Sequence, residues 1–161
     1  MSVNRFQPHV LVLPEDRANS QLANGFWLFP SLLSRRMQVL PYADGWLKVL
    51  ESFEANHANG MRENVSRFMV LLIDFDNHLE RLQFAQCKIP PDLAERVFIL
   101  GALIEPEDLK RAGLGTLEEI GSALARDCQV DTNNVWQHEH LRHNASELKR
   151  LREHVRPILF A

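Results

Sequence analysis

The sequence predicts an α/β domain with a four-stranded, mainly parallel sheet flanked by helices and with a helical C-terminal extension. Three observations lead to this fold class. Four short apolar segments recur along the first hundred residues, amphipathic segments separate them, and the length of 161 residues suits one domain. Near-continuous apolar runs are typical of strands buried on both faces, and strands that alternate with helices are typical of parallel sheets.

The expected strands are rich in Val, Ile, Leu and Phe, and each is too short for a helix. They cover residues 9–13, 37–40, 68–73 and 96–100, and each is followed by a proline, an aspartate or a glycine. We expect one domain over residues 1–161, in which 9–101 form the sheet-bearing core and 102–161 a helical C-terminal part.

The expected helices lie between these strands and after the last one. The segment 45–56 carries Trp46, Val49, Leu50 and Phe53 at helical spacing, and Thr116 with Glu119 forms a capping-box pattern. The full set is 17–29, 45–56, 78–86, 106–112, 116–126 and 139–155. Pro157 is expected to end the last helix, so that 158–160 would form an edge strand or a docking tail, or would pack across a homodimer.

Composition excludes several classes of protein. Hydrophobic residues make up 45% and charged residues 24% of the chain, which argues against disorder, and the net charge of −3 argues against a strongly basic nucleic-acid coat. The chain has no apolar run of 18 residues and no signal-like start, so we expect a cytoplasmic location and no membrane. Cys87 and Cys128 lie far apart, so no disulfide framework is expected.

Acidic residues follow the first three expected strands closely and the fourth within seven residues. The candidate site residues among them are Glu15 and Asp16 after the first strand, Asp74 and Asp76 after the third, and Glu105 and Glu107 after the fourth. Parallel sheets bind ligands outside the carboxyl ends of their strands, so we expect these acids to converge. In an extended segment Asp74 and Asp76 would point the same way and reach one divalent cation, although aspartate after a strand also commonly starts a turn.

Three segments carry a resemblance to a known family. A strand leads to Glu15 (9–16), a second strand leads into a turn at Gly45 and a helix with Lys48 (39–50), and a third strand ends in Asp74-Phe75-Asp76 (70–76). This ordered set resembles the TOPRIM domain, in particular its small stand-alone or OLD-nuclease-like branch. The match covers roughly residues 9 to 101.

The resemblance implies metal-dependent phosphodiester chemistry on nucleic acid, DNA or RNA. Asp74 and Asp76 would hold Mg²⁺ or Mn²⁺, and Glu15 would bind metal or act as a general acid or base. Asp16, Glu105 and Glu107 would be additional acids. Because the chain has no room for a breakage domain or a template-binding module, hydrolysis by water is the expected reaction, and the protein is expected to be a small nuclease.

Three basic side chains are candidate phosphate contacts. Lys48 and Arg81 follow the second and third strands within one or two helical turns, and His78 follows Asp76 by two residues. The alternatives are a solvated helix face for Lys48 and Arg81 and a helix start for His78. The histidines of the last expected helix do not have the H-E-x-x-H spacing, so we expect a solvated polar helix there rather than a metal site.

Two other readings of the acidic edge remain open. A catalytically silent TOPRIM-like module could use it to bind a structural cation or a partner protein, which the residues around Glu15 favour and the Asp74/Asp76 pair disfavours. A receiver-like phosphotransfer domain also gathers acids at strand ends, but no lysine follows a convincing later strand.

Overall fold

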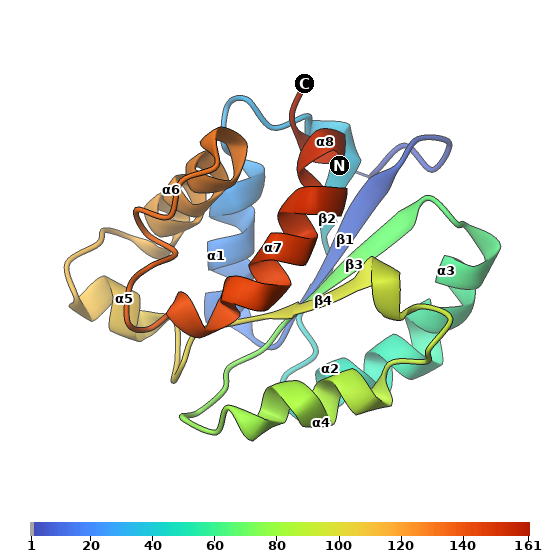
Figure 1. The fold of residues 1–161 in the computed structure, drawn as a ribbon, viewed down its shortest axis with the longest axis horizontal. Helices are drawn as coiled ribbons and strands as arrows, with labels where there is room; N and C mark the ends of the chain where they lie inside the picture. Colours follow the sequence, from blue (N-terminus) through green and yellow to red (C-terminus); the bar gives the residue numbers. More distant parts are fainter. Residues whose placement is uncertain (1) are drawn as a thin grey trace.

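The computed structural model describes residues 2–161 and has three layers, with helices on both faces of a central sheet (Figure 1). The sheet contains β1 (His9–Pro14), β2 (Met37–Val39), β3 (Arg67–Leu72) and β4 (Val97–Leu100). Their spatial order is β2-β1-β3-β4, and every pairing is parallel. The predicted fold class, an α/β domain with a four-stranded parallel sheet and a helical C-terminal region, is confirmed.

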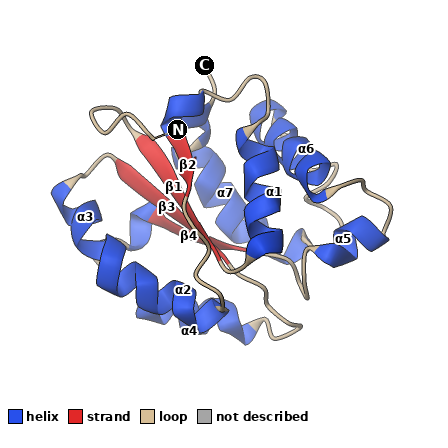
Figure 2. Cartoon of the chain, turned by 180° about the vertical axis from the view of Figure 1, so that it is seen from behind, coloured by secondary structure: helices blue, strands red, loops and turns tan. Residues whose placement is uncertain are grey.

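Helices cover the two faces of the sheet in separate groups (Figure 2). One face carries α1 (Arg17–Trp27), α6 (Leu117–Val130), α7 (Ala145–His154) and α8 (Arg156–Leu159). The other carries α2 (Trp46–Ser52), α3 (Ala58–Glu63) and α4 (Glu80–Lys88). The short α5 (Glu107–Arg111) follows β4 near the carboxyl edge of the sheet.

Strand alternation divides the core into two clusters. Val10 and Val12 of β1 point toward α1, α6 and α7, whereas Leu11 and Leu13 point toward α2 and α3. All four side chains are buried, which is why these strands are nearly continuous apolar runs.

Two glycines let α1 and α6 pack closely. A Cβ atom on Gly25 would lie 2.1 Å from the Glu118 carbonyl oxygen, and one on Gly121 would lie 2.0 Å from that of Leu22. Because those contacts are to backbone, neither position accepts a side chain without moving a helix. This contact fixes α1, whose first turn borders the acidic residues after β1.

Several predicted boundaries are corrected. The helix predicted at 45–56 is longer and consists of α2, a π-helical stretch (Phe53–His57) and α3. The helix predicted at 78–86 begins later, at Glu80, and the capping box at Thr116 is confirmed at the start of α6. The helix predicted at 139–155 is wrong at its start, because α7 begins only at Ala145 after a 3₁₀ turn (Arg142–Asn144).

The C-terminal segment packs inside the chain. Pro157 does not end the helical region but lies in the first turn of α8, where its missing N–H costs nothing. Leu159 and Phe160 are buried, and Phe160 forms an isolated antiparallel bridge with Leu32. The segment is therefore a docking tail on the chain's own core rather than an edge strand of the sheet. No helix within residues 2–161 is long and apolar enough to cross a membrane.

Candidate acidic site at the carboxyl edge of the sheet

Three carboxylates meet where β1 and β3 end. The two strands are paired so that Pro14 lies opposite Leu72, which brings Glu15 and Asp16 close to Asp74. One oxygen from each of these three side chains lies within 4.8 Å of the others. Within residues 2–161, no other group of three or more His, Cys, Asp or Glu side chains has its ligand atoms so close together.

Glu15 links the strand ends and the turn after β2. Its Oε2 accepts a 2.6 Å hydrogen bond from the Asp74 N–H, and its carbonyl oxygen accepts bonds from the N–H groups of Asp44 (2.7 Å) and Gly45 (3.2 Å). Asp44 and Gly45 both have positive φ, 70° and 144°, conformations that aspartate tolerates and glycine favours. The Asp44-Gly45 turn, a feature of the resemblance, thus lies against the backbone of Glu15.

Asn19 joins the other two carboxylates. Asp16 is the N-cap of α1 and accepts a 3.0 Å hydrogen bond from the Asn19 N–H. The side-chain Nδ2 of Asn19, which is fully buried, donates to Asp16 Oδ1 and Asp74 Oδ1, both at 2.9 Å. Asn19 is not among the site residues predicted from the sequence. The signal that could have found it is the N-cap spacing, since Asn19 is the third residue after Asp16.

Burial and mutual repulsion control the protonation of the site. The pKa of Asp74 is raised to about 8, mainly by burial and also by the charges of Glu15, Asp16 and Glu107, while the hydrogen bond from Asn19 opposes the shift. Burial also raises the pKa of Glu15, with added repulsion from Asp16 and Asp76, while the Asp74 N–H and Arg81 oppose the shift. Without a cation, ionising these carboxyls together is therefore unfavourable.

Asp76 does not join the cluster. The expected extended geometry of Asp74-Phe75-Asp76 is wrong, because Asp76 and Asn77 have φ of 49° and 59° and turn the chain toward α4. Asp76 is exposed and lies 3.7 Å from Arg81 Nη2. The turn is fixed by buried Phe75, whose N–H donates to the Ala102 carbonyl oxygen, and by the Asn77 N–H, which donates to that of Leu103.

The two acids expected after β4 differ in their surroundings. Glu107 contributes to the raised pKa of Asp74, and its Oε1 is buried without a hydrogen-bond partner in the described chain. Glu105 instead accepts a 2.9 Å bond from Arg111, which also binds Asp108 at 2.8 Å. Glu107 therefore belongs to the surroundings of the carboxylate cluster, and Glu105 is part of a separate surface ion pair.

The three basic candidates also differ. Arg81 donates from Nη1 to the Asp74 carbonyl oxygen at 2.9 Å, and its guanidinium lies 4.5 Å from the centre of the Trp46 ring. These contacts hold it beside the cluster in a largely buried position. Lys48 is exposed on α2 and lines a surface groove, and His78 is exposed with Nδ1 3.2 Å from Glu80.

The C-terminal histidines form no comparable group, and the expected solvated helix is wrong for His143. Its Nε2 lies 2.7 Å from the Gly101 carbonyl oxygen, and its ring packs edge-on against Phe75 at 5.2 Å. Burial lowers the pKa of His143, which favours the neutral ring. The rings of His138 and His140 stack on each other at 5.1 Å.

The donor set of the carboxylate cluster fits a hard divalent cation. Glu15, Asp16 and Asp74 present oxygen atoms, which Mg²⁺ and Mn²⁺ prefer over nitrogen or sulfur. A cation bound there would counter the repulsion that raises the pKa of Asp74. Sequence analysis identified Glu15 and Asp74 as principal ligands and Asp16 as an additional acid. In the structure Asp16 takes the place expected for Asp76.

No model of a known protein family matches this chain, and no curated protein or solved structure matches it significantly. A function is therefore supported by two features of the chain itself. One is the geometry of the carboxylate cluster, and the other is the resemblance of segments 9–16, 39–50 and 70–76 to the TOPRIM domain.

Proposed function

We propose that this protein is a small TOPRIM-type nuclease that hydrolyses phosphodiester bonds in DNA or RNA with Mg²⁺ or Mn²⁺. The observation that carries the proposal is the convergence of the partly buried carboxyls of Glu15, Asp16 and Asp74, among which the pKa of Asp74 is raised to about 8. Carboxylates crowded in this way are costly unless a cation is bound, and sites of this kind are typical of metal-assisted phosphoryl chemistry.

The topology supports the same proposal. Glu15 follows β1 and Asp74 follows β3, and these strands are neighbours in the sheet. The resemblance implies an acid after each of these two strands. The proposal assigns Asp16, rather than Asp76, as the third ligand, because Asp16 Oδ1 and Asp74 Oδ1 share the same donor, Asn19 Nδ2.

Each residue of the site then has a defined role. Glu15, Asp16 and Asp74 would hold the cation, which would polarise a phosphate group and offset the charge that develops during hydrolysis. Asn19 fixes the rotamers of Asp16 and Asp74, and Arg81 holds the Asp74 main chain. Lys48 and His78 are both exposed and would contact phosphates of the substrate backbone.

One observation favours a second candidate, a catalytically silent binding module that works with a partner protein. Asp76, which the sequence predicted as a principal metal ligand, is exposed on a turn and lies outside the cluster. A cation held by the remaining three would then stabilise the edge of the sheet or a contact with the partner, and no substrate would be cut.

Two measurements on the same protein separate these candidates. Mn²⁺ binding is followed by calorimetry, and cleavage of plasmid DNA and single-stranded RNA is followed in Mg²⁺ and in Mn²⁺. Asp74→Asn is the test variant, and Asp92→Asn, an exposed acid paired with Arg62 on the surface, is the matched control.

We expect Asp74→Asn to lose both binding and cleavage by at least about tenfold, and Asp92→Asn to keep both. Binding without cleavage in the wild type would favour the silent module. Absence of Mn²⁺ binding, or cleavage that Asp74→Asn retains, would overturn the proposed function.

A further inference from the structure

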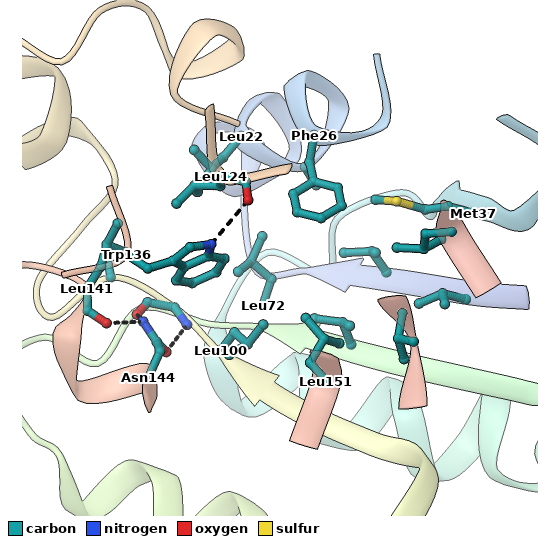
Figure 3. A pocket seen from close by; sticks show the side chains of 18 residues that line it. Leu22, Phe26, Met37, Leu72, Leu100, Leu124, Trp136, Leu141, Asn144 and Leu151 are labelled. Atoms are coloured by element: carbon teal, nitrogen blue, oxygen red, sulfur yellow. Dashed lines mark hydrogen bonds between the residues drawn. The ribbon is translucent and has the colours of Figure 1, made fainter. Parts of the chain in front are cut away.

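An apolar cavity of about 70 Å³ lies between the sheet and the helices α1, α6 and α7, on the face opposite α2 and α4. Figure 3 shows Phe26 and Leu22 above the cavity, Met37 at one end and Trp136 at the other. All 18 lining residues are buried except Phe26, which is partly exposed. Protein interiors contain few voids larger than a water molecule, so this one is a distinct feature of the fold.

The lining offers an occupant no free polar group. Trp136 donates its indole N–H to the Leu124 carbonyl oxygen at 3.2 Å. Asn144 donates to the carbonyl oxygens of Gly101 and Leu141, both at 2.9 Å, and accepts from the Gly101 N–H at 3.0 Å (Figure 3). The other lining side chains are hydrocarbon or thioether. A buried water needs two to four polar partners, so this cavity favours an apolar occupant over water.

The volume and the lining of the cavity restrict which apolar molecule can occupy it. A volume of 70 Å³ is several times the ~10–15 Å³ needed for one water, and about half of the ~150 Å³ cavity that accepts benzene. The lining includes Met37 of β2, Val12 of β1, Leu72 of β3 and Leu100 of β4, and thus crosses the whole sheet. Because its volume is about half of one that accepts benzene, the cavity fits a very short alkyl chain rather than a ring.

We propose that this cavity is a binding site for a short, uncharged alkyl chain. The ligand is held by dispersion contacts with Leu, Val, Met and Phe side chains and makes no hydrogen bond to the protein. The site does not depend on the proposed nuclease function, because the acidic cluster lies outside the carboxyl ends of the strands and shares no lining residue with the cavity.

The test uses propane as the probe, with the larger benzene as the comparison for size. Binding to the full chain is followed by chemical shifts of Val, Leu and Met methyl groups in NMR spectra. We expect propane to shift the methyl groups of lining residues such as Val12, Leu72 and Leu151, and to leave those of Leu11 and Leu71, which face the other layer, unchanged.

Two variants that fill the cavity provide the decisive comparison. Ala23→Leu adds three carbon atoms to the lining, and Val70→Leu adds one methylene group and is the variant less prone to overpacking. Val97→Leu is the matched control, because it adds the same methylene group to a neighbouring strand on the opposite face of the sheet.

We expect propane to bind about tenfold more weakly to Ala23→Leu, several-fold more weakly to Val70→Leu, and unchanged to Val97→Leu. Benzene should bind the wild type more weakly than propane does. The proposal is overturned by unshifted lining methyl groups, by equal propane affinity in wild type and Val70→Leu, or by tighter binding of benzene.

Discussion

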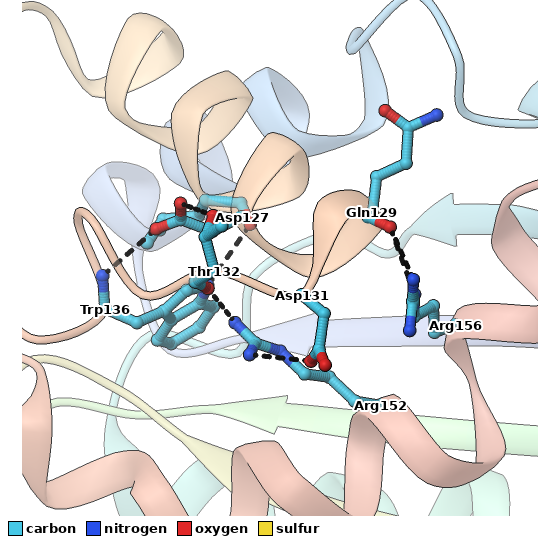
Figure 4. A network of polar contacts seen from close by, with 8 residues as sticks. Asp127, Gln129, Asp131, Thr132, Trp136, Arg152 and Arg156 are labelled. Carbon is cyan, nitrogen blue, oxygen red and sulfur yellow. Dashed lines mark hydrogen bonds and ion pairs between the residues drawn. The ribbon is translucent and has the colours of Figure 1, made fainter.

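Asp74 and Asp127 are both carboxylates withdrawn from solvent, yet their surroundings are opposite. Asp127 lies near the end of α6, where Oδ1 accepts from the Thr132 hydroxyl at 2.7 Å and Oδ2 accepts from the N–H groups of Val135 (2.7 Å) and Trp136 (3.4 Å) (Figure 4). Asp74 has one side-chain donor, Asn19, and lies near the carboxylates of Glu15, Asp16 and Glu107.

This difference separates a structural acid from a candidate functional one. Hydrogen-bond donors from its own chain surround Asp127, so its charge has partners and it ties the loop after α6 to the helix. Asp74 is partly withdrawn from water, has a single side-chain donor and lies beside other acids, so its ionised form is disfavoured. A buried carboxylate becomes a plausible ligand for a cation when the protein leaves its charge uncompensated.

The largest effect is expected when the donors around Asp127 lose their acceptor. Asp127→Ala leaves the Thr132 hydroxyl and two backbone N–H groups without a partner in a site where Asp127 itself is only 3% exposed. Each unpaired buried group costs ~1–3 kcal/mol, so we expect unfolding free energy to fall by about 3 kcal/mol. Urea denaturation followed by circular dichroism measures this loss.

Asp127→Asn is the control for this prediction. It keeps the shape and one acceptor oxygen, so it should lose about half as much stability as Asp127→Ala. A loss below about 1 kcal/mol for Asp127→Ala would show that the loop rearranges and that the donors find other acceptors.

A smaller effect, of opposite sign, is expected at Asp74. Its folded pKa of about 8 lies above the unfolded value of about 3.9, so the folded state binds the proton more tightly. The resulting stability is complete below pH ~4 and is lost as the pH rises toward 8. With a chelator present, Asp74→Asn should be more stable than the wild type by about 2 kcal/mol at pH 8 and nearly equal near pH 4.

Thermal unfolding at several pH values checks this prediction, with Asp76→Asn as the control. Asp76 is exposed and outside the cluster, so its variant should follow the wild-type pH dependence. Mn²⁺ should raise Tm in the wild type and in Asp76→Asn, but much less in Asp74→Asn. Parallel pH curves for Asp74→Asn and the wild type would mean that Asp74 ionises without penalty.

Much of the fold was predictable because the buried strands have a strong local signal. Residues 10–13 and 68–72 are apolar at every position, and Thr116 with Glu119 forms a capping box that marks the start of its helix. The start of α7 was not predictable in this way. Asn144 binds the backbone of Gly101 and Leu141, and the bond to Gly101 joins positions 43 residues apart, which no local pattern encodes.

In the candidate site, too, some positions could be predicted from local sequence and others depend on long-range contacts. Glu15 and Asp74 follow apolar strands directly, so their place at the carboxyl edge could be predicted from strand position alone. The conformation of Asp76 depends on the burial of Phe75 and on hydrogen bonds to residues 102 and 103, contacts invisible in the D-x-D spacing. Asn19 was missed because its role arises only when β1 and β3 are paired and Asp74 comes within reach of α1.

The smallest effect is expected at Asp131, which tests whether charge without burial matters near Asp127. Asp131 Oδ1 lies 3.3 Å from Arg152 Nη1, but the Asp131 side chain is 64% exposed, and exposed pairs contribute little (Figure 4). Asp131 has φ of 58°, a left-handed conformation that asparagine also adopts, so Asp131→Asn removes the charge without straining the backbone. We expect a change within about 0.5 kcal/mol in urea denaturation. A loss of unfolding free energy comparable to that of Asp127→Ala would mean that Asp131 holds Arg152 in its hydrogen bond to the Thr132 carbonyl oxygen. Burial would then be the wrong criterion for ranking the contributions of Asp127 and Asp131 to stability.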